Sequence, residues 1–245
     1  QQTMVDVIAN NLANVNTNGF KRSQVNFQDL LYTQITEPGV EVSSGVTAPV
    51  GLEIGNGVRV GDTTKVFSRG EVENTGRNLD VAIQGNGLFQ VTSPTGEFRY
   101  TRDGSFQIDG TGNLVTAMGY TVGISGLGDA QRVEIGADGT VSIFDATGAR
   151  SSAGTIQLAN FPNPAGLRSE GNNLLSETDA SGSVVTGTAG QTGLGTLQAG
   201  FLEKANVQMV TELVNLIKAQ RAYEMNSRAI RAGDDMLRTA NDVVR

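Results

Sequence analysis

The chain has 245 residues and a formal net charge of −7, with 32 Gly, 5 Pro and no Cys, His or Trp. Without His or Cys, the sequence excludes the common catalytic triads, thiolate nucleophiles, disulfides and imidazole or thiolate metal sites. The acidic balance argues against a protein that binds nucleic-acid phosphates through clustered Lys and Arg. No apolar run reaches the roughly 18 residues of a membrane-spanning helix. No charged leader with an apolar stretch opens the chain, so we expect no cleavable secretory signal.

Glycine and proline are distributed unevenly along the chain. The first 30 residues hold one Gly and no Pro, and the last 45 do the same, so residues 31–200 hold all the others. Gly and Pro disfavour helix interiors and mark turns. We therefore expect helical ends and a non-helical middle. The middle also carries a net charge of −8, which predicts that it meets water while the near-neutral ends contact protein.

The N-terminal segment, residues 1–30, opens with a helical stripe. Its apolar residues recur at spacings of three and four: Val5, Ile8, Leu12 and Val15. This spacing predicts one face of an α-helix. Gly19 fits a left-handed C-cap, and Phe20 fits the hydrophobic contact that often follows such a cap. The stripe is already running at Gln1, so we expect the helix to extend upstream of it.

The same segment is rich in asparagine. Five of these residues fall close together: Asn10, Asn11, Asn14, Asn16 and Asn18. Asn is a poor helix former because its amide competes with the backbone for hydrogen bonds. The run predicts amides that bond across a packed helix interface. The alternative is that they fray the helix end and start a turn.

The C-terminal segment, residues 201–245, carries a seven-residue repeat. Every seventh residue is apolar or aromatic: Leu202, Met209, Leu216, Tyr223, Ile230, Leu237 and Val244. Leu213 and Ile217 widen this face, and small residues such as Ala205 and Ala219 lie beside it. A sustained repeat predicts a long helix that packs along one stripe against another helix. The alternative is a core helix of a globular domain, although such helices typically run only about 8–20 residues.

The middle of the chain is predicted to be β-structure. Residues 31–57 look extended and are too long for an ordinary loop of a compact domain, a feature that is often functional. Residues 78–160 hold short strand candidates separated by turn signals such as Asp103-Gly104 and Asp138-Gly139. This spacing indicates a small antiparallel β-domain. Residues 161–200 are rich in Gly, Ser, Thr and Asn, and are expected to be loops leading back to the C-terminal helix.

No constellation of residues indicates catalysis or a bound cofactor. Gly85-Asn86-Gly87 is not followed by a helix pattern, and the stretch from Asp109 to Asn113 lacks the ligands of a calcium loop, so both are expected to be hairpin turns. Asp234 and Asp235 are adjacent on a helix and point in different directions. We expect a non-enzymatic protein with no metal and no cofactor.

Two long stretches resemble the bacterial flagellar rod and hook axial proteins. Residues 9–20 read ANNLANVNTNGF and residues 212–227 read ELVNLIKAQRAYEMNS, which are similar to the family's N- and C-terminal signatures. Residues 80–89 and 100–106 match in the same order, so the resemblance covers essentially the whole chain. Residues 31–58 resemble the extra segment of the family's distal-rod members.

The resemblance implies an α+β fold. Long N- and C-terminal helices would form a coiled-coil-like inner domain, with an extended β-segment and a small antiparallel β-rich outer domain. The implied parts are residues 1–30, the N-terminal helix of the inner tube; 31–75, the distal-rod segment with a linking β-hairpin; 76–200, the outer domain; and 201–245, the C-terminal helix of the inner tube.

The resemblance also implies a function and a set of partners. The chain would be a structural subunit that assembles helically into the distal rod, a rigid hollow drive shaft that passes motor torque to the hook. Its implied partners are further copies of itself, proximal-rod and hook subunits, the hook–rod boundary, the surrounding P-ring and L-ring proteins, the rod cap and the flagellar type III export apparatus, with no nucleic acid. The rod would span the periplasm towards the outer membrane, and the subunit would be exported without a cleavable signal.

The expected assembly residues fall into two groups. The first group lies on the terminal helices: Val5, Ile8, Asn10, Asn11, Leu12, Asn14, Val15, Gly19, Phe20, Leu202, Met209, Leu213, Leu216, Ile217, Tyr223, Ile230, Leu237 and Val244. The second is the rod-stiffening segment: Leu31, Tyr32, Pro38, Gly39, Gly51, Leu52, Ile54, Gly55, Gly57 and Val58. Two alternatives stay open. One is a hook or proximal-rod paralogue, which residues 31–58 discriminate, and the other is a carboxylate-dependent hydrolase on a β-scaffold.

Overall fold

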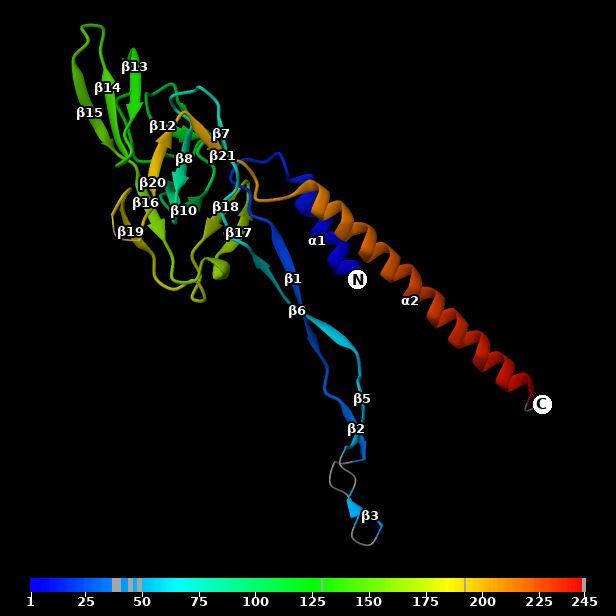
Figure 1. Ribbon diagram of the computed structural model, residues 1–245. Helices are drawn as coiled ribbons and strands as arrows, with labels where there is room; N and C mark the ends of the chain where they lie inside the picture. The colour runs from blue at the N-terminus through cyan, green and yellow to red at the C-terminus, as the bar shows by residue number, and fades with distance from the viewer. Residues whose placement is uncertain (37–40, 44–45, 48–49, 129, 192, 244–245) are drawn as a thin grey trace. The chain divides into compact units, whose positions relative to one another are not determined.

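The computed structural model describes the chain except for residues 37–40, 44–45, 48–49, 129, 192 and 244–245 (Figure 1). The described residues divide into two compact units. The first unit is Gln1–Arg22 together with Lys65–Arg245, and the second is Ser23–Thr64. Among the described residues, no helix combines the length and the apolar character that a bilayer crossing requires.

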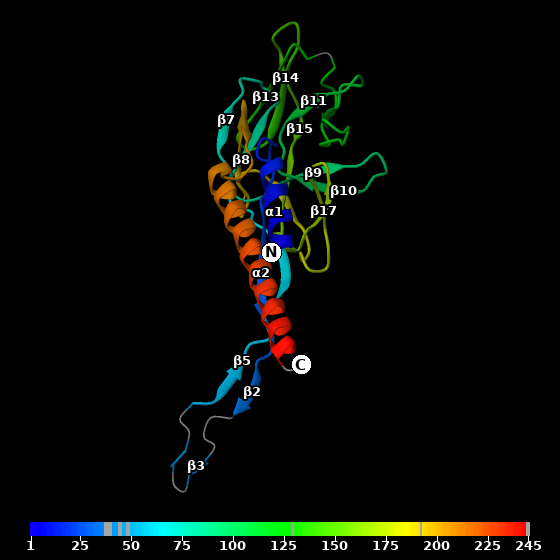
Figure 2. The same cartoon turned by 90° about the vertical axis from the view of Figure 1, so that its right-hand side faces the viewer.

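The first unit contains both α-helices and a β-domain. The helices are α1 (Gln2–Ala13) and α2 (Met209–Val243), and a short 3-10 turn, η1, covers Pro164–Gly166. α1 lies beside the N-terminal part of α2 (Figures 1 and 2). The strands are β7 (Val72–Asn74), β8 (Val81–Gln84), β9 (Leu88–Thr92), β10 (Phe98–Thr101), β11 (Phe106–Ile108), β12 (Leu114–Thr116), β13 (Arg132–Ile135), β14 (Thr140–Phe144), β15 (Arg150–Thr155), β16 (Gln157–Asn160), β17 (Arg168–Gly171), β18 (Leu174–Ser176), β19 (Val185–Thr188), β20 (Thr196–Ala199) and β21 (Phe201–Glu203).

The β-domain is an assembly of antiparallel sheets. A six-stranded sheet has the order β17-β18-β10-β9-β16-β19, and a three-stranded sheet has the order β13-β14-β15. Three further pairs are β8 with β20, β7 with β21, and β11 with β12. Because β21 pairs with β7, placing Glu203 opposite Val72, the sheet leads directly into the segment before α2.

The core of the β-domain consists of two clusters of buried side chains. Phe89 and Phe106 are fully buried and meet edge to face, with ring centroids 5.1 Å apart. A second cluster centres on Tyr100 and Phe161, whose centroids lie 4.8 Å apart. β8 is buried on both faces, whereas β13 alternates between exposed and buried positions, as a half-covered strand does. This burial stabilises the domain without help from another chain.

The fold class expected from the sequence is wrong. Strands account for 37 % of the structure and helices for 22 %, so the β part is dominant and not a small outer domain. Only the C-terminal helix is long: α2 has 35 residues and α1 has 12. The pair of long coiled-coil helices is therefore not present. α1 ends at Ala13 because an asparagine-rich turn follows it, and Asn14 has left the helical conformation at φ −100°.

The strands expected within residues 78–160 are confirmed, and the loops expected over residues 161–200 are only partly right. Four strands, β17 to β20, fall in that second stretch. They are short, and their high content of small polar residues hides the buried apolar side chains that they carry at Leu174 and Leu197. The division into residues 1–30, 31–75, 76–200 and 201–245 stays a prediction.

The second unit is a ladder of paired strands without a core. Its strands are β1 (Ser23–Asp29), β2 (Thr33–Thr36), β3 (Glu41–Ser43), β4 (Val46–Thr47), β5 (Leu52–Ile54) and most of β6 (Val58–Lys65). β1 pairs with β6, β2 with β5, and β3 with β4. Where side-chain burial is described, no residue of this unit is buried. Backbone and side-chain hydrogen bonds therefore hold it together.

Candidate assembly surface

The stripe expected on the N-terminal helix is largely turned inward. Ile8 and Asn11 are buried on α1, and Val5, Leu12 and Val15 are half-buried. Because α1 lies along α2, this face is the one that the chain covers by itself. The stripe therefore supplies part of the packing within one subunit.

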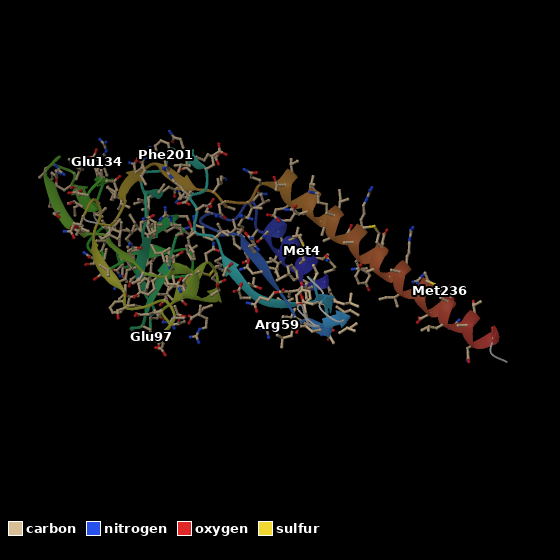
Figure 3. The ribbon with its side chains drawn as sticks, turned by 60° about the horizontal axis from the view of Figure 1, so that its bottom comes forward. Met4, Arg59, Glu97, Glu134, Phe201 and Met236 are labelled. Carbon is tan, nitrogen blue, oxygen red and sulfur yellow. The ribbon has the colours of Figure 1, made fainter. Side chains whose placement is uncertain are left out.

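The C-terminal repeat splits into a covered row and an uncovered row. Glu212 and Ala219 are buried, and Leu216 is half-buried. The larger apolar side chains of α2 stay exposed: Met209, Val210, Leu213, Val214, Ile217, Tyr223, Met225, Ile230, Met236 and Leu237. α1 is too short to reach the C-terminal part of α2, and Met236 lies on the stretch beyond it (Figure 3). Met209, Tyr223, Ile230 and Leu237 among them keep the seven-residue spacing, so they lie on one exposed apolar face of α2.

Two members of the repeat lie elsewhere. Leu202 is buried in β21 and belongs to the β-domain, because α2 begins only at Met209. Val244 lies outside the described residues. The helical repeat therefore starts one step later than its spacing indicates.

The asparagine run closes the end of α1. The side-chain Nδ2 of Asn14 donates to the backbone carbonyl oxygen of Asn10 at 2.9 Å and to the Asn10 Oδ1 at 3.1 Å. Thr17 Oγ1 donates to Asn14 Oδ1 at 3.3 Å, and Asn173 Nδ2 donates to the Asn18 carbonyl oxygen at 3.1 Å. For Asn10 and Asn14, these bonds fit the alternative in which the amides end the helix and build a turn.

Gly19 has a different place from the expected C-cap, because the helix ends six residues before it. Its φ is +68°, and its N–H donates to the Glu203 carbonyl oxygen at 2.7 Å. A Cβ here would lie 2.6 Å from the backbone of Arg102 and Asp103, so only glycine fits. Phe20 is buried against Ala205 and Val207, with Val15 packed beside them. Residues 19–20 thus fasten the N-terminal segment to the β-domain.

A buried ionic cluster lies at the same place, and the sequence patterns did not predict it. The Glu203 Oε1 accepts from Lys21 Nζ at 2.6 Å and from Gly70 N–H at 2.9 Å, while Oε2 accepts from Arg102 Nε at 2.6 Å. The Glu203 side chain is only 1 % exposed. Arg102 also donates to the carbonyl oxygens of Ile83 and Gly85 at 2.9 and 2.8 Å, and to that of Gly87.

Asn206 extends this cluster on its other side. Its Oδ1 accepts from the Arg22 N–H at 2.7 Å, and its Nδ2 donates to the Val66 carbonyl oxygen at 2.7 Å and to the Ser68 Oγ at 3.0 Å. We call Lys21, Arg102, Glu203 and Asn206 the polar junction. Its members are spread over the whole sequence, which is why spacing could not reveal it.

The electrostatics of the polar junction reflect two cations that share one carboxylate. Burial raises the pKa of Glu203, but the nearby charges of Arg102 and Lys21 outweigh this effect and hold the pKa below its usual value. Burial lowers the pKa of Lys21, and the attraction of Glu203 only partly offsets that effect. Glu203 is therefore ionised at neutral pH, and each of its oxygens accepts at least one charge-assisted hydrogen bond.

The predicted rod-stiffening residues lie in the second unit. Leu31 is 90 % exposed, and Tyr32, Leu52, Ile54 and Val58 are exposed as well. The ring of Tyr32 lies over Gly55, where an added Cβ would be 3.3 Å from Tyr32 Cε1.

Backbone and amide bonds connect the two sides of this ladder. Asn56 Nδ2 donates to the Leu31 carbonyl oxygen at 2.7 Å, and Leu30 N–H donates to the Gly57 carbonyl oxygen at 3.0 Å. Gly51 is half-buried, whereas Pro38 and Gly39 lie outside the described residues. In its described part, the unit thus presents apolar side chains on a frame of hydrogen-bonded strands.

The carboxylates of the acidic turns accept hydrogen bonds from residues of the same turn, as the interpretation as hairpin turns predicts. Asp109 accepts from Thr111 and Asn113, which lowers its pKa to about 2. Asp103 accepts from the Ser105 N–H and Oγ. Within the part of the chain that the structure describes, no three carboxylates gather into a group that could hold a metal ion.

Comparisons with known proteins place these features in a family. Family models match residues 1–21 (flagella basal body rod protein), 82–143 (flagellar hook protein FlgE/F/G D1 domain) and 198–243 (flagellar basal body rod FlgEFG protein C-terminal). A flagellar basal-body rod protein FlgG of Buchnera aphidicola is 46 % identical over 240 residues, which cover 97 % of this chain and 92 % of the relative. The chain belongs to the FlgG family of flagellar basal-body rod proteins. It is a structural distal rod subunit of the flagellar basal body.

Other FlgG proteins agree with this membership. The one from Borreliella burgdorferi is 41 % identical over 250 residues, covering 100 % of this chain and 94 % of the relative. The one from Bacillus subtilis is 40 % identical over 243 residues, covering 96 % and 91 %. The resemblance drawn from the sequence is thereby confirmed. FlgG family membership implies assembly with other rod and hook components of the basal body.

Proposed function

We propose that this chain polymerises helically into a rigid hollow shaft that carries torque from the motor to the hook. The observation that carries the proposal is the exposed apolar face of α2 formed by Met209, Tyr223, Ile230 and Leu237, which the chain's own α1 leaves uncovered. Burying apolar area contributes roughly 25 cal/mol per Å², so such a face stabilises any contact that covers it. A helical polymer supplies that contact repeatedly, because each copy presents the same face.

We propose that the second unit stiffens this shaft by contacting neighbouring subunits. Its exposed apolar residues include Leu31, Leu52 and Val58, and none of its described side chains is buried. Two-stranded ladders are at best marginally stable alone in water. The unit therefore gains stability when another subunit covers its apolar side chains, and the gain ties it to assembly.

The proposal extends to partners and location. Besides other copies of the chain, the shaft would contact proximal-rod subunits at one end and, across the hook–rod boundary, hook subunits at the other. The P-ring and L-ring proteins would surround it. The rod cap and the flagellar type III export apparatus would act during assembly, without a cleavable signal on the chain. The shaft would span the periplasm towards the outer membrane. The work of the subunit would be mechanical and not catalytic.

A charge on the exposed face of α2 tests the proposal. Tyr223 is 60 % exposed, so Tyr223→Asp should leave the stability of the single subunit almost unchanged while placing a carboxylate in the subunit interface. Cells that produce this variant should lack complete rods in electron micrographs of basal bodies. Leu216→Asp, in the half-buried row, should have the same outcome.

The matched control is Ala229→Asp, which adds the same charge about 120° around the helix from Tyr223. Ala229 is exposed as well. Rods built normally by Tyr223→Asp, from a subunit shown to be folded, would contradict the assignment of this face to assembly.

A further inference from the structure

The polar junction connects four segments that are far apart in sequence. Lys21 follows the turn after α1, Gly70 precedes β7, Arg102 follows β10, and Glu203 ends β21 just before α2. One carboxylate therefore touches the segment that comes from α1, the segment that leads to α2, and the β-domain between them. A single side chain is thus the meeting point of the helical and β parts of the first unit.

We propose that Glu203 is a positioning residue that locks both helix-bearing segments to the β-domain and makes the joint between them rigid. The proposal rests on the proposed function, since a shaft that carries torque needs joints that do not bend. It adds a residue and a mechanism: stiffness inside each subunit, separate from the contacts between subunits.

The geometry of the hydrogen bonds favours a lock over a simple contact. Three donors approach two oxygens at 2.6 to 2.9 Å, and bonds to an ionised group are directional and about twice as strong as neutral ones. The apolar contact at the same place is small, with Phe20, Ala205 and Val207 as its buried members. Apolar burial has no preferred direction, so it would allow the segments to pivot.

Backbone contacts leave the short linker before α2 little slack. Lys204 N–H donates to the Glu71 carbonyl oxygen at 2.8 Å, and Asn206 bonds to residues on both neighbouring segments. The backbone of Gly70 lies so close to the Lys204 carbonyl oxygen that an added Cβ would be 2.0 Å away from it. The segment from Glu203 to Asn206 is therefore fixed at each of its bonded points.

The surroundings of the polar junction are not filled by packed side chains, so its hydrogen bonds and ion pairs hold the segments in place. A cavity of about 270 Å³ borders Lys21, Arg102 and Phe161. A second cavity, of about 460 Å³, borders Arg22, Gly70, Asn206 and Glu212. With open space on two sides, the removal of the charged bonds would leave room for the segments to move.

The lock is tested on the purified full chain, which has no cysteine of its own. Cysteines are introduced at two exposed sites, Thr211 in the first turn of α2 and Ser151 in β15, and are spin-labelled. Double electron–electron resonance should give one narrow distance distribution for the parent chain. Glu203→Gln replaces one accepting oxygen by a donor, and should widen the distribution about twofold because a buried cation loses its partner.

Two further variants keep the test decisive. Glu170→Gln is the control. Glu170 in β17 pairs with Arg99 in β10, the strand that precedes Arg102, but it bonds to neither terminal segment, so this variant should leave the distance distribution narrow. If Glu203→Gln does not fold, the combined variant Lys21→Met, Arg102→Met, Glu203→Leu replaces it, since an apolar substitute for a buried ionic cluster is often as stable as the original. It should fold and still widen the distribution.

The outcomes separate the lock from the shaft. A distribution that stays narrow in the folded Glu203 variants, or one that is already broad in the parent chain, would overturn the lock and leave the proposed function untouched. Curvature of rods built from the Glu203 variants, measured in electron micrographs, should exceed that of parent rods. Wider distributions with unchanged rod curvature would overturn the mechanical role of the lock. Failure of the parent chain to form rods at all would overturn the proposed function instead.

Discussion

The β-domain of the first unit and the ladder of the second unit use the same kind of strands in opposite ways. The β-domain buries Phe89, Val91, Phe106 and Leu158 completely, so its strands are stable through side-chain packing. The described part of the ladder buries none of its side chains and still exposes large apolar residues such as Leu31 and Ile54. The first is held together by a buried core, whereas the described part of the second is held by hydrogen bonds and leaves its apolar side chains exposed.

Truncating a core side chain of the β-domain should lower the free energy of unfolding more than any other variant, because this domain is stabilised by its packing. Phe89→Ala removes a fully buried ring that meets Phe106 at 5.1 Å and should lower the free energy of unfolding by about 3–5 kcal/mol. Denaturant unfolding of the purified chain measures it. Leu31→Ala is the counterpart in the ladder, and should change the same quantity by less than about 0.5 kcal/mol. Similar losses for both variants would erase the distinction between the two regions.

A backbone variant at the fastening point should have the next largest effect. Gly19→Ala forces a non-glycine residue to a φ of +68° and places its Cβ 2.6 Å from the Arg102 backbone. The strain should cost about 1–3 kcal/mol or more, because the neighbouring atoms are backbone and cannot easily yield. Thermal unfolding checks it. Gly96→Ala is the control, since its φ is also positive and open space surrounds it, so it should cost less.

Acid should weaken the polar junction in a defined direction. The pKa of Glu203 in the folded chain lies below the ordinary value of a glutamate, so the unfolded chain takes up the proton first as the pH falls. The stability that the ionised Glu203 contributes to the folded chain is fully present above about pH 4.5 and is lost as the pH falls through the lowered pKa of the folded state. Lys21 and Arg102 are the charged groups that face the carboxylate.

Urea unfolding of the parent chain and of Glu203→Gln, repeated between about pH 6 and pH 3, measures this contribution. The difference in stability between the two chains should shrink towards low pH. A difference that stays constant across the range would contradict the assigned charge state of Glu203.

The smallest effect on stability should accompany a large effect on assembly. Leu31→Asp changes a side chain that is 90 % exposed, so the free energy of unfolding should stay within about 0.5 kcal/mol of the parent value. Rods built from this variant should be shorter or more curved in electron micrographs, since the charge would be placed in a subunit contact. Thr63→Asp, at an exposed polar position of the same ladder, is the control. Straight, complete rods from Leu31→Asp would remove the stiffening role of the ladder.

Local signals in the sequence were informative where the chain decides its structure locally. Asp109 and Asp138 close the turns that their Asp-Gly contexts predict, and the repeat from Met209 onward forms one helix. The fold class was misjudged because the stripe of α1 did not show how early the asparagine run would end it. Leu202 kept the spacing of the repeat although pairing with β7 had already placed it in a strand.

Long-range contacts were beyond the reach of sequence patterns. Lys21 and Glu203 are 182 residues apart, and neither belongs to a periodic pattern. A lysine next to an arginine in an otherwise nearly uncharged segment, residues 7–28, was the one available hint. The choice of partner depends on the registers of β7, β10 and β21, which only the folded chain establishes.

The bond between the Gly19 N–H and the Glu203 carbonyl oxygen has an architectural consequence. At 2.7 Å, it brings the point where the chain leaves α1 next to the point where it returns to α2. Everything between these points is therefore an insertion whose two ends meet. Insertions of this kind can grow, shrink or be exchanged without moving their attachment points. An interior that keeps Gly70 and Arg102 at the junction can accordingly change in size elsewhere while the same helices carry it.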